Sequence, residues 1–311
     1  MGTAPLACAS LAALVRAPEF QIVGIVTQPD KPKGRDLKLQ FSAVKEVALK
    51  NHLAILQPES ARDEEFIQTL RNLNPDLIVV VAYGQILSQT ILDLPHWGCL
   101  NVHTSLLPKY RGAAPIQWAL LHNESETGVT IIKMDAGLDT GDILAQQVTP
   151  ISPADNSQTL HDRLAQLGAE LLPKTIEDFI RGKILPRKQP AEGSSYARKI
   201  SKEDGRLVWS EPASKLWNQI RAFTPWPGAF TFQLAQPKPR LLKIWAAEVV
   251  EKFSGEPGVI LEAEKNGIMV ACGEKALRIL TLQPDSGKRL SAQEFLSGHN
   301  LRVGQKLISI V

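Results

Sequence analysis

The sequence is poor in cysteine, with Cys8, Cys99 and Cys272 as the only thiols among 311 residues. An odd number of cysteines so far apart excludes a disulfide framework and a C-x-x-C zinc site, and we expect no bound metal. Few and reduced thiols are typical of the cytoplasm. We therefore predict a cytoplasmic protein, or one of an organellar matrix or stroma.

Long apolar runs and a strong net charge are also lacking. No stretch reaches the roughly 18–20 apolar residues of a membrane helix, so we predict no membrane span. The apolar run at 6–15 follows no positive charge, which argues against an export signal and favours an amphipathic first helix. Lys and Arg number 35 against 32 Asp and Glu, and the resulting +3 neither requires nor excludes a nucleic-acid partner.

What the sequence does have is an alternation of apolar runs and helical patterns. Strands are predicted at 21–27, 53–56, 76–82, 98–103, 128–134 and 143–148. Helices are predicted at 42–52, 62–73, 86–94, 113–122 and 157–181, the last with Asn156 as its cap. A polar loop is expected at 30–39. This order predicts an α/β domain with a doubly wound, mostly parallel sheet over residues 1–182.

The pattern changes after residue 182. Residues 183–202 are basic and rich in Pro, Gly and Ser, so we predict a linker. Residues 203–311 begin with a helix near 213–223 and continue as short alternating segments between turns. This succession predicts a second domain, a small antiparallel β-barrel of the OB type.

Polar side chains gather near the end of the predicted strand at 98–103. Asn101 and His103 are two residues apart and share one face of the strand, near the edge where open α/β sheets bind ligands. An amide and an imidazole there can polarise a carbonyl group and carry a proton. Asp139, in the segment Leu-Asp-Thr-Gly-Asp, can orient or charge the imidazole. Each side chain also has a purely structural interpretation, as a strand-end histidine, a backbone-bonding amide and a turn former.

Ser105 offers a competing chemistry. A Ser–His–Asp hydrolase would need Ser105 as the nucleophile, but no G-x-S-x-G elbow surrounds it. The sequence also lacks the G-x-G-x-x-G, Walker A and H-E-x-x-H motifs. Hydrolase, nucleotide-binding and zinc-protease interpretations are therefore disfavoured.

The motif Asn101-x-His103-x-Ser105-Leu106-Leu107-Pro108, followed by Asp139, resembles the folate-dependent formyltransferases. Further segments, in order along nearly the whole chain, resemble the methionyl-tRNA formyltransferases within that superfamily. They are 27–30 (TQPD), 80–84 (VVAYG), 111–117 (RGAAPIQ), 128–131 (GVTI), 137–142 (GLDTGD), 201–204 (SKED) and 221–227 (RAFTPWP).

The resemblance implies a role for each matching residue. Asn101, His103 and Asp139 match the catalytic trio, and the first domain is expected to be Rossmann-like. The segments that match folate contacts and the wall of the pterin pocket are Ser105, Leu106, Leu107, Pro108, Gln85, Ile86 and Leu87. The implied formyl donor is 10-formyltetrahydrofolate, which acts as a cosubstrate.

Charge placement bears on the acceptor. Residues 31–50 hold six cations and two acids, a local +4, and residues 181–206 hold eight cations and three acids, a local +5. Such clusters can neutralise phosphates, and barrels of this kind bind oligonucleotides, although a solvated charge run is the alternative. The resemblance implies initiator methionyl-tRNA as the acceptor, a chain acting as a monomer, and a tRNA-contacting loop that contains Lys33, Arg35 and Lys38.

Two other functions stay open. A sugar-nucleotide N-formyltransferase would carry the same trio, but the basic loop at 31–38 argues against it. A tRNA- or folate-binding protein without activity would not need all three residues. For Trp217 and Trp226 we favour core packing over stacking on nucleotides.

The sequence differs from that of the family it resembles at two places. Thr104 stands where many members carry glycine. Members also begin with a strand before the turn at Gly2-Thr3, and this chain lacks it, so we expect a start codon assigned too late or a shortened chain.

Overall fold

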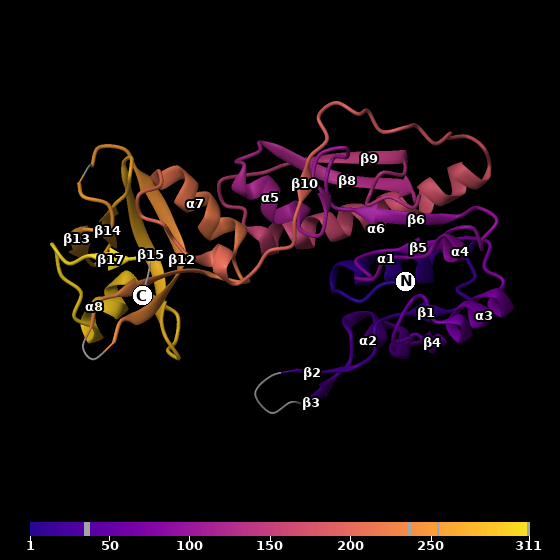
Figure 1. The fold of residues 1–311 in the computed structure, drawn as a ribbon, viewed down its shortest axis with the longest axis horizontal. Helices are drawn as coiled ribbons and strands as arrows, with labels where there is room; N and C mark the ends of the chain where they lie inside the picture. The colour runs from indigo at the N-terminus through magenta and orange to yellow at the C-terminus, as the bar shows by residue number, and fades with distance from the viewer. Residues whose placement is uncertain (34–37, 236–237, 254, 310–311) are drawn as a thin grey trace. The chain divides into compact units, whose positions relative to one another are not determined.

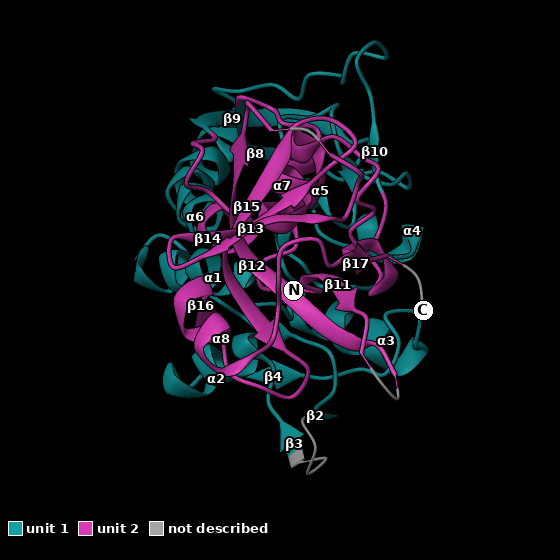
Figure 2. Cartoon of the chain, turned by 90° about the vertical axis from the view of Figure 1, so that its left-hand side faces the viewer, with its two compact units in different colours: residues 1–115, 126–150, 161–197 teal, residues 116–125, 151–160, 198–311 magenta. Residues whose placement is uncertain are grey.

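The computed structural model describes residues 1–33, 38–235, 238–253 and 255–309 (Figure 1). The chain divides into two compact units (Figure 2). Unit 1 contains residues 1–115, 126–150 and 161–197, and unit 2 contains residues 116–125, 151–160 and 198–311. Residues 183–197 of the expected linker thus belong to unit 1, and residues 198–202 belong to unit 2. The domain boundaries at 182 and 202 stay a prediction.

Unit 1 is an α/β structure whose main sheet has the order β5-β6-β8-β9. Its elements are α1 (Leu6–Arg16), β1 (Ile25–Val26), β2 (Lys31–Lys33), β3 (Lys38–Gln40), α2 (Ala43–Lys50), β4 (Ile55–Leu56), α3 (Glu64–Leu73), β5 (Ile78–Val80), α4 (Gln89–Leu92), β6 (Cys99–His103), β7 (Arg111–Gly112), β8 (Glu126–Lys133), β9 (Asp142–Pro150) and β10 (Tyr196–Ala197). β5 is parallel to β6 and β1 is parallel to β4, whereas β8 and β9 are antiparallel to their neighbours. The predicted α/β class is confirmed, with a sheet that combines both kinds of pairing.

Helices α5 (Pro115–Leu121) and α6 (Ser157–Ile180) each have residues in both units. Asn156 caps α6 as predicted, since its side-chain oxygen accepts hydrogen bonds from the backbone of Gln158 and Thr159 at 2.9 and 3.1 Å. In the described part of the chain, no helix has both the length and the apolar character needed to cross a membrane.

One face of β6 packs against α6, and the other face carries Asn101 and His103. Leu100 and Val102 are buried, and Gly168 of α6 lies so near that a Cβ there would stand 2.8 Å from Val102 Cγ1. Glycine at 168 therefore lets α6 pack closely on this face. Because strand side chains alternate, Asn101 and His103 point to the opposite face.

The first two residues lie between β1 and β5. The Met1 ammonium donates to Val79 O at 2.6 Å, Val81 N donates to Met1 O at 2.9 Å, and Gly2 N donates to Val26 O at 2.9 Å. Burial lowers the pKa of this ammonium to about 6. A largely apolar cavity of about 520 Å³, with Leu11 in its lining, adjoins Met1. The expected additional strand stays a prediction.

The polar loop expected at 30–39 contains two short paired strands, and residues 34–37 between them lie outside the described part of the chain. β2 and β3 lie side by side (Figure 1). They pair antiparallel, with Lys31 opposite Gln40 and Pro32 opposite Leu39. The expectation was wrong because backbone pairing joins these strands, and the four side chains just named are all exposed, so no apolar alternation marks them. Arg35 lies outside the described residues.

Unit 2 contains a closed antiparallel sheet of order β13-β14-β15-β12-β11-β17, with β16 beside β15. Its elements are the 3₁₀ turn η1 (Glu203–Gly205), α7 (Ala213–Ala222), β11 (Ala229–Gln233), β12 (Arg240–Val250), β13 (Ile260–Glu264), β14 (Gly267–Ala271), β15 (Ala276–Pro284), β16 (Leu290–Ser291), α8 (Ala292–Gly298) and β17 (Leu307–Ile308). Hydrogen bonds from Ile260 N to Gln305 O and from Leu307 N to Gly258 O join the two ends of the sheet. The predicted small barrel is confirmed.

Arg221 of α7 connects this helix to residues 151–160 of the same unit. Its buried guanidinium donates to Asp155 O at 2.7 Å and to Ser152 O at 2.8 Å, and it lies 4.1 Å from the Trp217 ring centroid. Trp217 packs against the barrel core, as favoured from the sequence. Trp226 is 50% exposed on the turn after α7, so core packing was the wrong expectation there.

We expect Arg221→Met to lower the free energy of unfolding by about 2–4 kcal/mol, because its hydrogen bonds to Asp155 O, Ser152 O and Asn218 Oδ1 are lost while the apolar stem is kept. Denaturant unfolding measures the change. The control is Arg206→Met, which removes an exposed ion pair with Glu203 and should cost less than about 1 kcal/mol. Equal losses in the two variants would contradict the assigned role of Arg221.

Candidate active site

The candidate site is built on the end of β6. His103 is the last residue of this strand, and the adjacent parallel strand β5 ends at Val80, which is paired with Asn101. The carboxyl ends of the two strands therefore meet at one edge of the sheet, the edge at which α/β folds bind ligands. Segment 85–87 follows β5, and segment 104–112 follows β6.

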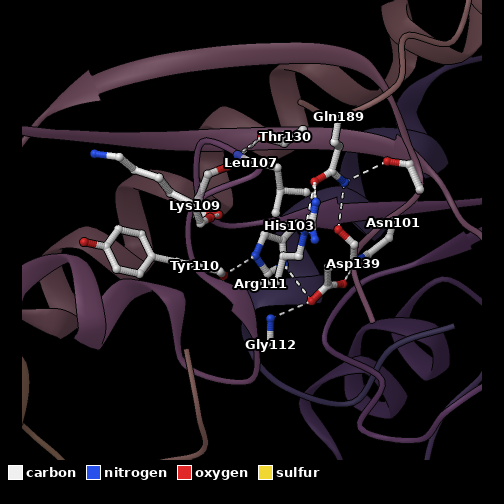
Figure 3. Close-up of polar contacts among 12 residues, drawn as sticks. Asn101, His103, Leu107, Lys109, Tyr110, Arg111, Gly112, Thr130, Asp139 and Gln189 are labelled. Carbon is white, nitrogen blue, oxygen red and sulfur yellow. Dashed lines mark hydrogen bonds and ion pairs between the residues drawn. The ribbon is translucent and has the colours of Figure 1, made fainter. Parts of the chain in front are cut away.

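Asp139 joins Asn101 and His103 at this edge (Figure 3). Asn101 Nδ2 donates to Asp139 Oδ1 at 3.1 Å, and Gly112 N donates to Asp139 Oδ2 at 2.8 Å. His103 Nδ1 lies 3.6 Å from the same Oδ2. The structure thus brings together the three residues that the sequence singles out, with the carboxylate between the amide and the imidazole.

The backbone of Asp139 is in the left-handed region, with φ of +53°. Aspartate tolerates this conformation better than most residues, but it still costs free energy that the surroundings must supply. The hydrogen bonds of the carboxylate supply part of that restraint. The side chain is 13% exposed, so the charge is largely shielded from solvent yet reachable.

The two ring nitrogens of His103 have different neighbours. Nε2 lies 2.9 Å from the carbonyl oxygen of Tyr110, closer than the 3.6 Å between Nδ1 and Asp139 Oδ2, so we expect the neutral ring to carry its proton on Nε2. Nδ1 faces the carboxylate of Asp139. The imidazole is 6% exposed, so its partners decide its orientation.

Ser105 takes part in a network that folds the segment after β6. Its hydroxyl donates to Lys109 O at 2.6 Å, and Thr130 Oγ1 donates to Ser105 O at 2.6 Å. Leu107 N in turn donates to Thr130 Oγ1 at 3.1 Å. The ring nitrogens of His103 face Tyr110 and Asp139 instead, so the structure does not form the Ser–His pair of the hydrolase alternative.

The residues predicted to contact folate differ in accessibility. Leu107 and Leu87 are buried, Leu106 and Pro108 are half-buried, and Thr104 is also buried. Gln85 is held in place, since its side chain accepts from Ala61 N at 2.7 Å and donates to Glu59 O at 3.2 Å.

Ile86, between Gln85 and Leu87, is 70% exposed and offers an apolar surface to a ligand. The folate contacts stay a prediction. Within the ranges described above, no three His, Cys, Asp or Glu side chains converge as metal ligands.

Sequence reasoning missed one residue that binds the site loops. Gln189 Nε2 donates to Asp139 O at 2.7 Å and to Gly141 O at 2.8 Å, and its Oε1 accepts from the Arg111 guanidinium (Figure 3). Arg111 and Gly112 lie in the motif 111–117, but no feature of the sequence marks Gln189.

Part of the basic segment 181–206 is neutralised. The ion pairs are Arg181–Glu177, Lys183–Asp178, Arg198–Asp204 and Arg206–Glu203. The Arg198 guanidinium lowers the pKa of the Asp204 carboxyl below its ordinary range. Arg187 and Lys188 in unit 1 and Lys199 and Lys202 in unit 2 are exposed, so each unit keeps exposed cations in this segment.

Comparisons with known proteins identify the family of the chain. Residues 3–176 match the family described as formyl transferase, and residues 199–300 match the formyl transferase C-terminal domain. A methionyl-tRNA formyltransferase of Caldanaerobacter subterraneus is 48% identical over 98% of this chain and 97% of its own length. One of Geobacter sulfurreducens is 46% identical over 99% of this chain and 95% of its own. The chain belongs to the methionyl-tRNA formyltransferase family. Its predicted class, a transferase, is confirmed.

Solved structures share the fold of this family member. An N-formyltransferase from Helicobacter canadensis, in complex with folinic acid and dTDP-3-aminofucose, has a TM-score of 0.63 and 23% identity, covering 89% of this chain and 97% of that one. HypX from Aquifex aeolicus, in complex with tetrahydrofolic acid, has a TM-score of 0.59 and 19% identity, covering 84% and 47%. At these identities the likeness establishes the fold alone.

We expect neutral His103 to carry its proton on Nε2, because Tyr110 O accepts from that atom. Long-range ¹H–¹⁵N correlation of the ring nitrogens measures the tautomer. His299 is the control, and we expect the other tautomer there. Its Nδ1 lies 3.1 Å from Phe295 O, so Nδ1 should carry the proton. A proton on Nδ1 of neutral His103 would contradict the assignment.

Proposed function

We propose that the chain transfers the formyl group of 10-formyltetrahydrofolate to the α-amino group of initiator methionyl-tRNA. One observation carries the proposal: Asn101, His103 and Asp139 converge at the carboxyl end of β6 in a chain that matches methionyl-tRNA formyltransferases over nearly its whole length. The geometry suits acyl transfer, because hydrogen-bond donors and a carboxylate stand side by side.

The first step is the attack of the uncharged α-amine on the formyl carbon, which places negative charge on the formyl oxygen. Asn101 Nδ2 has two N–H bonds, and Asp139 Oδ1 accepts only one of them. The second can donate to the developing oxyanion. His103, when protonated, offers Nδ1–H beside it, since Nε2 is bound to Tyr110 O.

The second step breaks the bond between the formyl carbon and N10 of the folate. The amine loses one proton and N10 gains one, so the reaction needs no other reactant. Asp139 can accept the proton from the amine, directly or through a water molecule, and pass it to N10. Its contacts with Asn101 Nδ2 and Gly112 N keep the carboxylate in place during the transfer.

The acceptor is proposed from charge placement and the family. The names of the relatives and the exposed cations of segment 181–206 support a tRNA over a sugar nucleotide. Arg35 lies outside the described residues, and of Lys33 and Lys38 only the backbone is described, so their tRNA contacts rest on the sequence. We further propose that one chain is the acting unit and that it works in the compartment that holds charged tRNA, the cytoplasm of a bacterium.

The proposal predicts transfer of labelled formyl from 10-formyltetrahydrofolate to initiator methionyl-tRNA and much slower transfer to elongator methionyl-tRNA. The amount of labelled tRNA formed with time measures this selectivity. An amino sugar nucleotide serves as the competing acceptor. Transfer to the sugar nucleotide, with none to either tRNA, would overturn the proposal.

We expect Asn101→Ala and His103→Ala each to lower kcat by roughly 100–1,000-fold, the loss associated with removing one oxyanion donor. Steady-state rates at saturating folate and tRNA give the values. His161→Gln is the control, because this histidine pairs with Asp162 on α6, outside the proposed mechanism, and its rate should stay normal. Near-normal turnover of both alanine variants would refute the catalytic assignment.

A further inference from the structure

The segment 183–197 forms hydrogen bonds with several loops and strands around the site. Arg187 exchanges two backbone hydrogen bonds with Ile143, at 2.7 and 2.9 Å. Further along, β10 pairs with β7, and Ser195 Oγ accepts from Tyr110 N at 2.9 Å. The segment is therefore fixed to the catalytic unit on both sides of Gln189.

Every donor and acceptor of the Gln189 side-chain amide is hydrogen-bonded. Its amide nitrogen makes two donations, to Asp139 O and Gly141 O, and its amide oxygen accepts two N–H groups of Arg111 at 2.8 and 3.1 Å. An amide has two donors and two acceptor lone pairs, so all four are occupied. Its sequence neighbours are exposed whereas Gln189 is half-buried, which agrees with a fixed side chain.

The same two loops are joined twice. The Asp139 carboxylate accepts from Gly112 N, and Gln189 links the Asp139 carbonyl to the adjacent Arg111. The left-handed φ of Asp139 means that this backbone needs restraint, and Gln189 binds its carbonyl oxygen directly. Rotation of this backbone would swing the carboxylate away from His103.

We propose that Gln189 is a positioning residue, which holds the Asp139 carboxylate beside His103 and so makes the catalytic geometry depend on the basic segment 183–197. The proposal rests on the proposed formyl transfer. Gln189 acts through Asp139 and touches no reacting atom. A glutamine is required because the position must donate on one side and accept on the other.

Gln189→Glu is the sharpest variant. Glutamate keeps the size and can still accept from Arg111, but it cannot donate to Asp139 O or Gly141 O. We expect kcat to fall roughly 10–100-fold, as for a misplaced catalytic group, while KM for folate stays unchanged. Gln68→Glu, on the exposed face of α3, is the matched control and should keep the normal rate.

A double-mutant cycle separates positioning from a general structural effect. If Gln189 acts through the carboxylate, Gln189→Glu should slow the wild-type chain but cause no further loss in an Asp139→Asn background. Additive losses in kcat would overturn the proposal. So would a normal kcat for Gln189→Glu.

A readout without turnover keeps this test distinct from the test of the proposed function. The ring ¹⁵N resonances of His103 should change in Gln189→Glu, whereas those of His299 should not. If the wild-type chain transfers no formyl group yet these resonances respond, the proposed function fails and the positioning role stands. Unchanged His103 resonances would overturn the positioning role itself.

Discussion

The arrangement of the site depends on one carboxylate. Asp139 binds the side-chain amide of Asn101 and the backbone N–H of Gly112, and it faces Nδ1 of His103. These partners come from a strand end and a loop that are 27 or more residues away in the sequence. A single charged group thus determines how two loops and a strand converge, and the remaining contacts serve to keep it there.

The sheet makes that convergence possible. Alternation along β6 sends Val102 toward α6 and sends Asn101 and His103 to the other face, while Gly168 lets the helix approach closely. The buried face therefore holds the strand rigidly in position. Tyr110 O lies 2.9 Å from Nε2 of His103, so packing and one backbone acceptor orient the ring with Nδ1 toward the carboxylate.

Much of this could be predicted from local pattern. Alternation and motif spacing identified β6, the shared face of Asn101 and His103, and the cap Asn156, because each depends on residues close in sequence. α8 was missed although its signal is present: Ser291 and Glu294 form a capping box ahead of an apolar pair. The pairing of β2 with β3 was missed because exposed backbone pairing leaves no apolar alternation in the sequence.

Gln189 shows where such prediction ends. A glutamine in a basic, proline-containing segment is ordinary, and its meaning comes only from the carbonyls of Asp139 and Gly141 and the guanidinium of Arg111, which the fold brings to it. The side chain of Gln189 also has to be uncharged. A carboxylate at 189 would form an ion pair with Arg111 and face two carbonyl oxygens, whereas an amide binds both sides. Asp139 thereby remains the acidic group of this cluster, and its charge stays available to His103.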